Sequence, residues 1–472
     1  LLPALAESGV RLVSWDDLDE EQKAQLTGRF TEDLFPLLTP LSMTTGPGRS
    51  FPRLVSLGLA LAVALRRSEG GATELGYVPI PDDIDRFLPV PGCSDVIAIE
   101  EIVGANAEAL FPSATIERVY PFRASRLGDV EIDEDSAGSL LSAIADEVEE
   151  RPYKPIIRLE VDATMPREVR AYLLKAIRED ASGEGSALTR SDIHEMPSPL
   201  DLTSIAELAS LDVPGGTFSP YSADEPLDVD RTIFEILDEG DVLCHHPFHD
   251  FRSTVGRFLG EAARDPEVVA IKLTLYRTGR DSPVMDALLH ALSAGKDVSV
   301  FVELKARFDE ESNIHWTHRL KEAGARVVYG VVGFKTHAKT ALVVRRVNGA
   351  VRRYVHIGTG NYNAATARFY TDLGLMSADP DLGADLNDFF NELTGGGGPP
   401  KSQFRRLLVA PYSLAQGIDR MIDREIDHAR AGRPARIQAK LNGLADRKIV
   451  RALYDASRAG VQIDLIVRSI CT

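Results

Sequence analysis

The alternation of apolar and polar positions is clearest between about residues 221 and 394. Short apolar runs typical of strands alternate there with segments that have the apolar period of amphipathic helices. A strand–helix alternation of this kind is typical of a largely parallel sheet covered by helices, which we therefore predict. The expected strands are 268–276, 298–304, 326–330 and a run after Thr336, and the expected helices are 283–294 and 310–323.

Before residue 221 the pattern is more mixed. Apolar runs at 54–65 and 156–161 predict strands, the first of them buried, and amphipathic spacing at 139–150 and 168–177 predicts helices. We interpret residues 1–27 as the remnant of an N-terminal helical domain and residues 28–220 as an α+β head domain. A loop around 214–216 leads into the next domain.

The glycine- and proline-rich stretch at 394–400 predicts a linker, and the sequence after it repeats the sequence before it. A shift of 165 residues places Asp281 on Asp446, Gly295 on Gly460 and Val298 on Ile463. The alternative is that any helix, glycine cap and strand would align in this way. The predicted fold is a multidomain α/β protein, in which the head precedes two tandem α/β domains, 221–394 and 395–472, the second incomplete.

Composition narrows the class of protein. With 472 residues, 44% apolar and 26% charged, the chain is typical of an ordinary multidomain globular protein. The formal charge of −18 argues against a surface that coats nucleic acid, so we expect no nucleic-acid partner and only a local phosphate site. The longest apolar stretch, 54–65, is too short to span a membrane.

The three cysteines, Cys93, Cys244 and Cys471, are far apart and form no C-x-x-C motif. We interpret all three as packing residues of a protein in the reducing cytoplasm. The chain begins at Leu1 without methionine or a signal segment, so we expect it to be part of a longer protein.

The most informative chemistry lies around His337 and Lys339. If the run after Thr336 is a strand, alternation places both side chains on one face, where an imidazole nucleophile and an ammonium group would meet the same substrate. That arrangement suits phosphoryl transfer. A lone histidine beside apolar residues is more often structural, so the surrounding motifs decide between the two interpretations.

The H-x-K pattern followed by the turn Gly358-Thr359-Gly360-Asn361, within a duplicated α/β domain, resembles the phospholipase D superfamily. Asn361 would orient the phosphoryl group or the imidazole, and the glycines would allow close approach of the backbone. The carboxylate usual in that superfamily is missing, because Val344 stands in its place. This departure argues against a plain phosphodiesterase.

A closer resemblance is to the histidine-phosphorylated polyphosphate kinase family, carried by the segments 245–248, 275–277, 302–310, 313–316, 335–339, 356–361 and 366–372. The resemblance implies that His337 attacks the γ-phosphorus of ATP and that a polyphosphate end then accepts the phosphoryl group. Lys335, Lys339, Arg277 and Arg307 would favour the neutral imidazole and stabilise the transition state.

Arg277 and Arg307 each follow a predicted parallel strand, where the sites of α/β proteins assemble, and we interpret them as phosphate clamps rather than surface arginines. The resemblance associates Mg²⁺ with these two positions. Because arginine cannot ligate a cation, we expect the metal to be held through the ATP phosphates, with Glu303 or Asp309 nearby.

Two further residues match nucleotide-binding positions of that family. Tyr370 would stack on the adenine, with core packing as the alternative. Arg468 matches a later arginine that contacts ATP, and the 165-residue shift places it on Glu303 at the end of a strand. The resemblance also implies a homodimer or larger homo-oligomer.

The remaining histidines carry weaker expectations. His245, His246 and His249 invite a zinc interpretation, but Pro247 breaks the helix that such spacing needs, so we expect them to shape the loop before a helix from about 252. A second group, His315 and His318 with Trp316, is predicted to form a packed or cleft-lining helix face, and the role of His356 stays open.

Two parts of the family pattern are expected outside this sequence: a helical domain before Leu1 and a second catalytic histidine after Thr472, 165 residues beyond His337 and so near position 502. We therefore expect this polypeptide to be weakly active or inactive alone. The alternatives to a kinase are a phospholipase D-like phosphodiesterase and an inactive scaffold that binds polyanions. Retention of His337, Lys339 and Asn361 argues against the scaffold.

Overall fold

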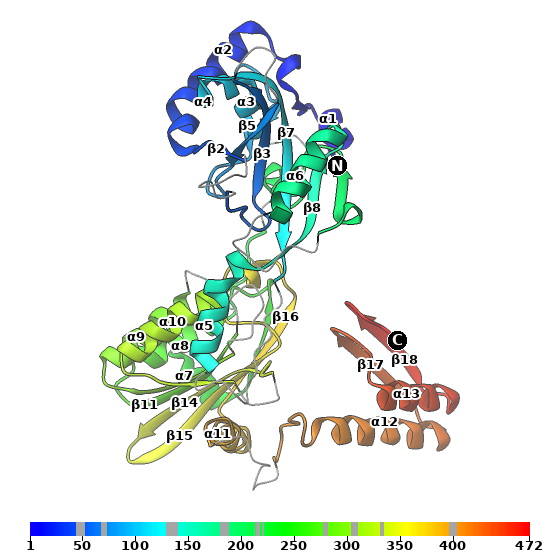
Figure 1. Cartoon of the computed structure of the whole chain (residues 1–472). Helices are drawn as coiled ribbons and strands as arrows, with labels where there is room; N and C mark the ends of the chain where they lie inside the picture. The colour runs from blue at the N-terminus through cyan, green and yellow to red at the C-terminus, as the bar shows by residue number, and fades with distance from the viewer. Residues whose placement is uncertain are drawn as a thin grey trace. The chain divides into compact units, whose positions relative to one another are not determined.

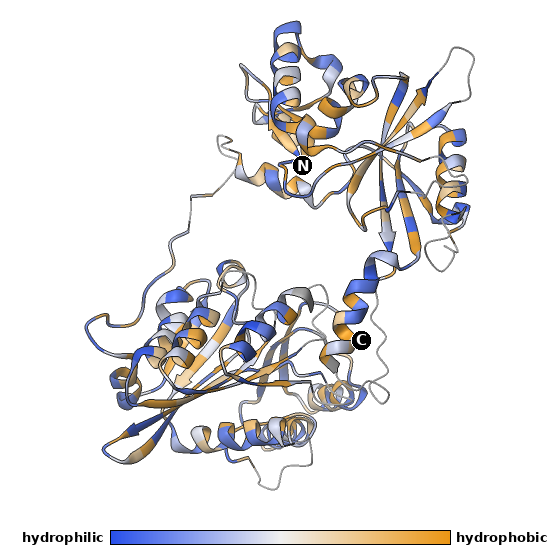
Figure 2. Cartoon of the chain, turned by 60° about the vertical axis from the view of Figure 1, so that its left-hand side comes forward, coloured by the Kyte–Doolittle hydropathy of each residue, from blue (hydrophilic) through white to orange (hydrophobic). Residues whose placement is uncertain are grey.

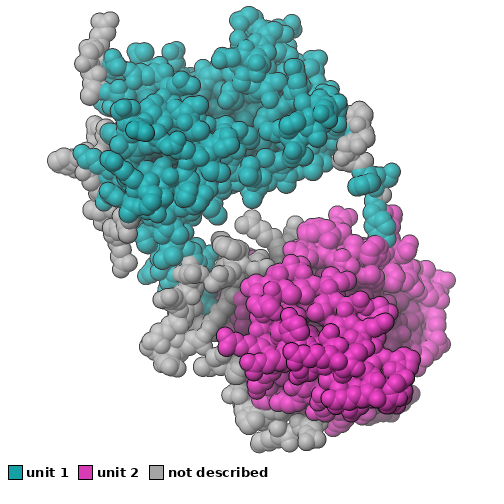
Figure 3. Space-filling model, turned by 90° about the vertical axis from the view of Figure 1, so that its right-hand side faces the viewer, with its two compact units in different colours: residues 1–133, 142–221 teal, residues 134–141, 222–472 magenta. Residues whose placement is uncertain are grey.

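The computed structural model describes residues 1–43, 52–67, 73–128, 140–179, 188–211, 213, 218–219, 221–276, 282–303, 310–330, 335–395 and 404–472. The chain forms two compact units, residues 1–133 with 142–221 and residues 134–141 with 222–472 (Figure 3). We describe each unit by itself, with the element labels of Figure 1.

Unit 1 is built on a sheet of strand order β2-β4-β3-β7-β8-β9 and a smaller sheet of order β1-β6-β5. Its strands are β1 Leu12–Val13, β2 Leu41–Ser42, β3 Leu59–Arg66, β4 Glu74–Pro79, β5 Phe87–Pro89, β6 Val96–Ala98, β7 Thr115–Arg126, β8 Ile156–Asp162 and β9 Ile193–Met196. Its helices are α1 Leu2–Glu7, α2 Glu20–Arg29, α3 Ile99–Ala105, α4 Ala107–Leu110, α5 Leu140–Glu150, which begins in unit 2, and α6 Arg167–Glu179.

Strand β3 is apolar throughout because both of its faces are covered. Leu61 and Val63 pack into a cluster that includes Leu26 of α2, whereas Ala62 and its neighbours pack against the cluster of Leu173 on α6. The expected strand at 54–65 begins only at residue 59, since the chain turns at 56–58. Residues 1–27 take part in this core, because β1 pairs with β6 and Leu26 is fully buried.

Unit 2 contains a sheet of order β10-β16-β15-β14-β11-β12-β13. Its strands are β10 Val242–His246, β11 Val268–Leu275, β12 Asp297–Val302, β13 Arg326–Tyr329, β14 Lys339–Val347, β15 Ala350–Gly358 and β16 Asp372–Ser377. The accompanying helices are α7 Ile233–Glu239, α8 Arg257–Arg264, α9 Pro283–Ser293, α10 Glu310–Glu322 and α11 Pro380–Thr394. Apolar residues, orange in Figure 2, run along the strands of this sheet.

The prediction of a largely parallel sheet is wrong. Among the described strands, β11, β12 and β13 run parallel, whereas β11–β14, β14–β15, β15–β16 and β10–β16 are antiparallel pairs. The antiparallel pair β14–β15 follows from the two-residue turn between these strands. Asn348 and Gly349 adopt φ values of 51° and 83°, the left-handed conformation that a tight hairpin requires and that Asn-Gly favours.

The segment after residue 404 repeats elements of the preceding sheet. It contains α12 Leu414–Arg430, β17 Arg436–Leu441, α13 Arg447–Arg458 and β18 Gln462–Val467, with β17 and β18 parallel. The 165-residue shift carries the bounds of β12 onto those of β18 and carries Gly295, with φ 76°, onto Gly460, with φ 96°. Both glycines lie between a helix and a strand in the left-handed conformation.

Asp385 of α11 anchors the chain just before the repeat. Its buried carboxylate accepts the backbone N–H groups of Arg405, Arg406 and Leu407 at 2.7–3.0 Å and a guanidinium N–H of Arg405 at 3.0 Å. These donors hold the pKa of Asp385 below its usual value against the opposing effect of burial. Leu407 also packs against the apolar cluster of α11, β14 and β15.

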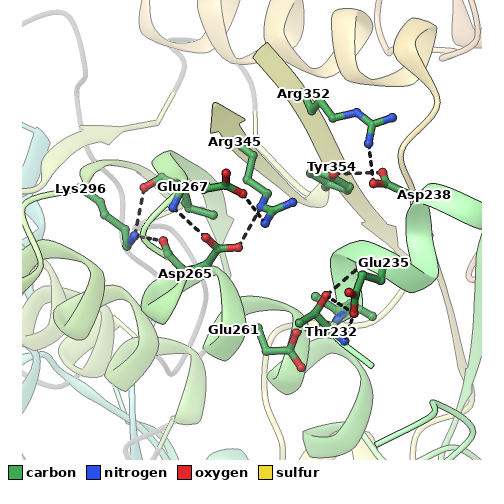
Figure 4. A network of polar contacts seen from close by, with 12 residues as sticks. Thr232, Glu235, Asp238, Glu261, Asp265, Glu267, Lys296, Arg345, Arg352 and Tyr354 are labelled. Carbon is green, nitrogen blue, oxygen red and sulfur yellow. Dashed lines mark hydrogen bonds and ion pairs between the residues drawn. The ribbon is translucent and has the colours of Figure 1, made fainter. Parts of the chain in front are cut away.

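The hairpin end of β14 and β15 carries a polar network (Figure 4). The Arg345 guanidinium donates to Asp265 and Glu267, each at 2.8 Å, and lies 4.5 Å from the centre of the Phe234 ring. The Tyr354 hydroxyl donates to Asp238 at 3.0 Å. These bonds tie the hairpin to α7 and to the turn between α8 and β11.

The three cysteines differ in burial. Cys244 is buried, but the prediction that all three cysteines pack in the core is wrong, since Cys93 and Cys471 are exposed. A search of the described residues finds no helix with the length and hydropathy needed to cross a membrane.

Candidate functional site

His337 lies next to β14 rather than on it. The strand begins at Lys339, so the expectation that alternation along a strand aligns His337 with Lys339 is wrong in its geometry. Lys339 pairs with Gly358, the last residue of β15, in the antiparallel ladder. The His337 segment and the turn that leads to Asn361 therefore leave the paired strands at the same end.

Tyr276, just after β11, brings the basic groups together. Its ring is nearly buried and lies edge-to-face with the His337 ring at 5.1 Å between centroids. The Nζ atom of Lys339 is 4.8 Å from the ring centre of Tyr276, and that of Lys335 is 5.6 Å away. Cations at these distances are attracted to an aromatic ring, so one phenol gathers two ammonium groups beside the imidazole.

Lys339 also holds the backbone of the histidine. Its Nζ donates to the His337 carbonyl oxygen at 2.6 Å, and the Lys339 side chain is buried whereas His337 is exposed. The imidazole of His337 is accordingly accessible to a substrate, while the His337 backbone is held by Lys339. Sequence reasoning assigned no role to Tyr276, although it stands directly before Arg277 at the end of a predicted strand.

Glu303 fixes the residue before the histidine. This buried carboxylate follows β12 and accepts the Thr336 N–H at 2.7 Å, while the Asn313 side chain donates to the Glu303 carbonyl oxygen at 3.1 Å. Glu303 thus acts on the loop that carries His337. The hydrogen bond from the Thr336 N–H explains why a buried carboxylate stands at the end of an otherwise apolar strand.

The described residues contain no cluster of side chains that would bind Mg²⁺ directly. Nowhere among the described residues do three or more His, Cys, Asp or Glu side chains gather as ligands for a metal. Carboxylate oxygens are the ligands that Mg²⁺ prefers, and the described contacts of Glu303 are directed at the protein backbone. Arg277, Arg307 and Asp309 lie outside the described residues, so the clamp and metal expectations at those positions stay predictions.

A cavity of about 450 Å³ adjoins the histidine. Its lining consists of residues 335–340 and the end of β15, and of Leu386, Phe389, Glu392 and Leu393 of α11 with residues 407–412. The lining therefore combines a basic segment with mostly apolar residues, among which Glu392 is a carboxylate. Ligand sites commonly combine an apolar surface with a few placed polar groups.

Two buried histidines lie beneath the turn at residues 358–361. His356 is 3% exposed, and its Nδ1 lies 2.7 Å from the Tyr362 hydroxyl oxygen. Burial lowers the pKa of His356 to about 3, and the nearby His246 acts in the same direction. Burial likewise lowers the pKa of His246. Both rings are therefore neutral at pH 7.

His245 and His246 are the last residues of strand β10, and His249 lies after the turn that follows it. His246 Nδ1 lies 2.8 Å from the His249 carbonyl oxygen, and His249 Nδ1 accepts the His245 backbone N–H at 3.1 Å. These contacts agree with the expectation that the histidines shape the approach to the next helix, which begins as a π-helical turn at Arg252–Gly256.

Tyr370 and Arg468 lie together although nearly a hundred residues separate them. Tyr370 is 47% exposed, so the core-packing alternative for this residue is wrong. The Arg468 guanidinium carbon lies 5.8 Å from the Tyr370 ring centre, and its Nε donates to Asn442 at 2.8 Å. As expected from the 165-residue shift, Arg468 directly follows β18 as Glu303 follows β12.

The expectation for α10 needs a correction. Trp316 is buried, but His315 and His318 are exposed, so the packed face of the helix does not contain these histidines. Spacing by three residues brings two side chains near each other on a helix without deciding which way that face points.

Comparisons with known proteins agree with this architecture. Sequence models of three domains match in order: the polyphosphate kinase middle domain at residues 21–208, C-terminal domain 1 at 232–398 and C-terminal domain 2 at 407–472. The solved structure of polyphosphate kinase from Porphyromonas gingivalis is 32% identical, superposes with a TM-score of 0.78, and is matched over 100% of this chain and 68% of its own.

Curated relatives show the same similarity. The polyphosphate kinase of Mycolicibacterium gilvum is 44% identical over 480 residues, which covers 99% of this chain and 64% of the relative. That of Streptomyces coelicolor is 44% identical over 477 residues, covering 99% and 62%. The chain thus spans slightly less than two thirds of these relatives. It belongs to the polyphosphate kinase family.

Proposed function

We propose that this chain carries the phosphoryl-accepting half of a polyphosphate kinase, which transfers the γ-phosphoryl group of ATP reversibly to inorganic polyphosphate through a phosphohistidine at His337. The observation that carries the proposal is the exposed His337 imidazole, held edge-on to Tyr276 with the Lys335 and Lys339 ammonium groups around the same ring. An accessible nucleophile among fixed positive charges suits phosphoryl transfer.

The transfer takes place in two displacements. A nitrogen lone pair of neutral His337 forms an N–P bond to the γ-phosphorus, and the P–O bond to the β,γ-bridging oxygen breaks, so that ADP leaves with the electron pair. A terminal oxygen of polyphosphate then attacks the same phosphorus and the N–P bond breaks. The two ammonium groups disfavour a further positive charge on the ring and stabilise the negative oxygens of the transition state.

Other residues complete the proposed site. Tyr370 and Arg468 would bind the nucleotide, an assignment supported by the exposure of the tyrosine and by the guanidinium above its ring. Arg277 and Arg307 would bind phosphate oxygens. Asn361 would orient the transferred group. ATP would enter as its Mg²⁺ complex, with the ion on the phosphates.

The wider assignments belong to the same proposal. We assign 28–220 to the head, whose core residues 1–27 also join, and 221–394 and 395–472 to tandem phospholipase D-like domains. The working protein would be a cytoplasmic homo-oligomer. A phosphodiesterase is less well supported, because Val344 packs against the apolar cluster of α11 where that chemistry has a carboxylate.

Labelling with γ-³²P-ATP and Mg²⁺ tests the proposal. We expect label that is labile in acid and stable in alkali, and we expect His337→Ala to abolish it. His290→Ala removes an exposed histidine from α9 and serves as the matched control, which should label normally. Label that survives His337→Ala would remove His337 as the acceptor, and diester hydrolysis without nucleotide would favour the phosphodiesterase.

A further inference from the structure

A second and much smaller cavity lies beneath the turn that carries Asn361. It has a volume of about 10 Å³, and its lining includes His246, His356, Asn361, Gly358 and Gly374. A volume of this size accommodates a single water molecule. The cavity is separate from the 450 Å³ cavity beside His337, although Gly358 lines both.

Three buried side-chain atoms at this cavity lack a hydrogen-bond partner within the described part of the chain. They are His246 Nε2, His356 Nε2 and Asn361 Oδ1. His246 and His356 are 5% and 3% exposed. Buried polar atoms are nearly always satisfied, so three such atoms around one small cavity indicate a bound polar molecule.

The hydrogen bond at Nδ1 of each histidine ring determines whether its Nε2 atom donates or accepts. His246 Nδ1 faces the His249 carbonyl oxygen, which can only accept, so Nδ1 carries the proton and Nε2 is an acceptor. At His356, burial raises the pKa of Tyr362 well above 10, which keeps the phenol protonated. The described contacts give this buried hydroxyl no other acceptor, so we assign its proton to the bond with Nδ1, which leaves His356 Nε2–H as a donor into the cavity.

We propose that one water molecule binds in this cavity, donates to His246 Nε2 and Asn361 Oδ1, accepts from His356 Nε2–H, and so holds the Asn361 amide in position for phosphoryl transfer. Two acceptors and one donor match the capacity of water. A cation would meet the His356 N–H as a repelling donor, and the Asp372 carboxylate that also lines the cavity already accepts from the Thr359 hydroxyl at 2.8 Å. The role in transfer rests on the proposed function, whereas the water site does not.

Glycines make room for the water. A Cβ atom at Gly374 would lie 2.8 Å from His356 Nε2, and one at Gly358 would lie 2.9 Å from His356 Cε1. Contacts this short do not occur without movement of the ring. Gly374→Ala therefore places a methyl group where His356 directs its N–H, and should displace the water and shift the His356 ring without removing any polar side chain.

The first experiment measures tautomers and is independent of activity. In ¹⁵N-histidine spectra of this chain, assigned with the His246→Gln and His356→Gln variants, we expect His246 as the Nδ1–H form and His356 as the Nε2–H form. His356 should stay neutral between pH 7 and 5, and Gly374→Ala should shift the His356 Nε2 signal. An Nδ1–H form of His356, or its protonation near pH 6.5, would overturn the water site.

The second experiment tests positioning through single-turnover rates of phosphohistidine formation. We expect Gly374→Ala to slow the reaction about tenfold, because misplaced groups lower the rate of the chemical step. The ATP concentration needed for half-maximal rate should change little. Asn361→Ala should slow it about 100-fold, and the double variant should match Asn361→Ala alone. If the rate reductions of the two single variants multiply in the double variant, Gly374 and Asn361 are not coupled through the water.

Two variants keep this experiment decisive. Gly240→Ala, at an extended residue with no atom within 4 Å of the added Cβ, is the matched control and should react normally. Tyr362→Phe retains the ring and the cavity but removes the donor to His356 Nδ1; it should mix the His356 tautomers and slow transfer only when Asn361 is present. An unchanged tautomer in Tyr362→Phe would contradict the assignment.

Discussion

The two ends of the β14–β15 hairpin differ in whether their polar groups have hydrogen-bond partners within the protein. At the turn end, Arg345 is bonded to Asp265 and Glu267, and Tyr354 to Asp238 (Figure 4). At the other end, among the described residues, His356 and Asn361 each keep a buried polar atom without a protein partner. A satisfied network stabilises the fold, whereas unsatisfied atoms cost stability and are retained where a site needs them.

The largest expected effect is on stability at the turn end. Arg345→Met leaves the largely buried Asp265 carboxylate and the partly exposed Glu267 without their guanidinium partner, and breaking such a network should lower the free energy of unfolding by about 3 kcal/mol. Urea denaturation measures the change. Arg346→Met, at an exposed neighbour on the same strand, is the control and should change stability little. Equal effects of the two substitutions would contradict the stabilising role of the network.

At the site end the corresponding change should act on the reaction. Lys339→Met keeps most of the side-chain volume but removes the ammonium group that donates to the His337 carbonyl oxygen. We expect phosphohistidine formation to slow about 100-fold, as is typical for loss of one fixed charged donor, with a smaller loss of stability than in Arg345→Met. Rates and urea midpoints measured together decide this. An unfolding midpoint as low as that of Arg345→Met, with normal labelling, would break the comparison.

The smallest expected effect is a pH dependence from the buried imidazole. The pKa of His356 is lowered to about 3 from an ordinary value of 6.5, so below pH 6.5 the unfolded chain binds a proton that the folded chain does not. Stability should therefore fall as pH decreases from 6.5 toward 3, by about 2 kcal/mol between pH 6.5 and 5 from this residue.

Urea denaturation of the parent and of His356→Gln across that range isolates the contribution. In the variant, the slope of the free energy of unfolding against pH should be smaller by an amount that corresponds to nearly one proton. Identical slopes would mean that His356 titrates normally in the folded protein, and the contrast between the two ends of the hairpin would then rest on Asn361 alone.

Much of the fold was predictable because strands and helices depend on local periodicity. The expected strand 156–161 and helix 283–294 lie within a residue of β8 and α9. The parallel sheet was wrong because strand direction depends on connections rather than on periodicity. The Asn348-Gly349 pair is a readable hairpin signal that contradicts a parallel crossover at that point.

The site was less predictable. Motifs identified His337, Lys339 and Asn361 as candidates, but Tyr276 and Glu303 act on the His337 segment from more than thirty residues away in sequence. His246 likewise lies opposite His356 only because β10, β16 and β15 are neighbours in the sheet. Contacts of this kind depend on tertiary structure, which no local pattern specifies.

The carboxylate of Asp385 also has a mechanical consequence. Tension on the chain from the side of residue 408 would reach four hydrogen bonds at a single buried group before it reached the strands of the sheet. Because the four bonds share one acceptor group, they would bear the load together rather than fail one after another. The strands of the sheet, together with the segment 335–340 that lines the large cavity, are thereby shielded from strain arising farther along the polypeptide.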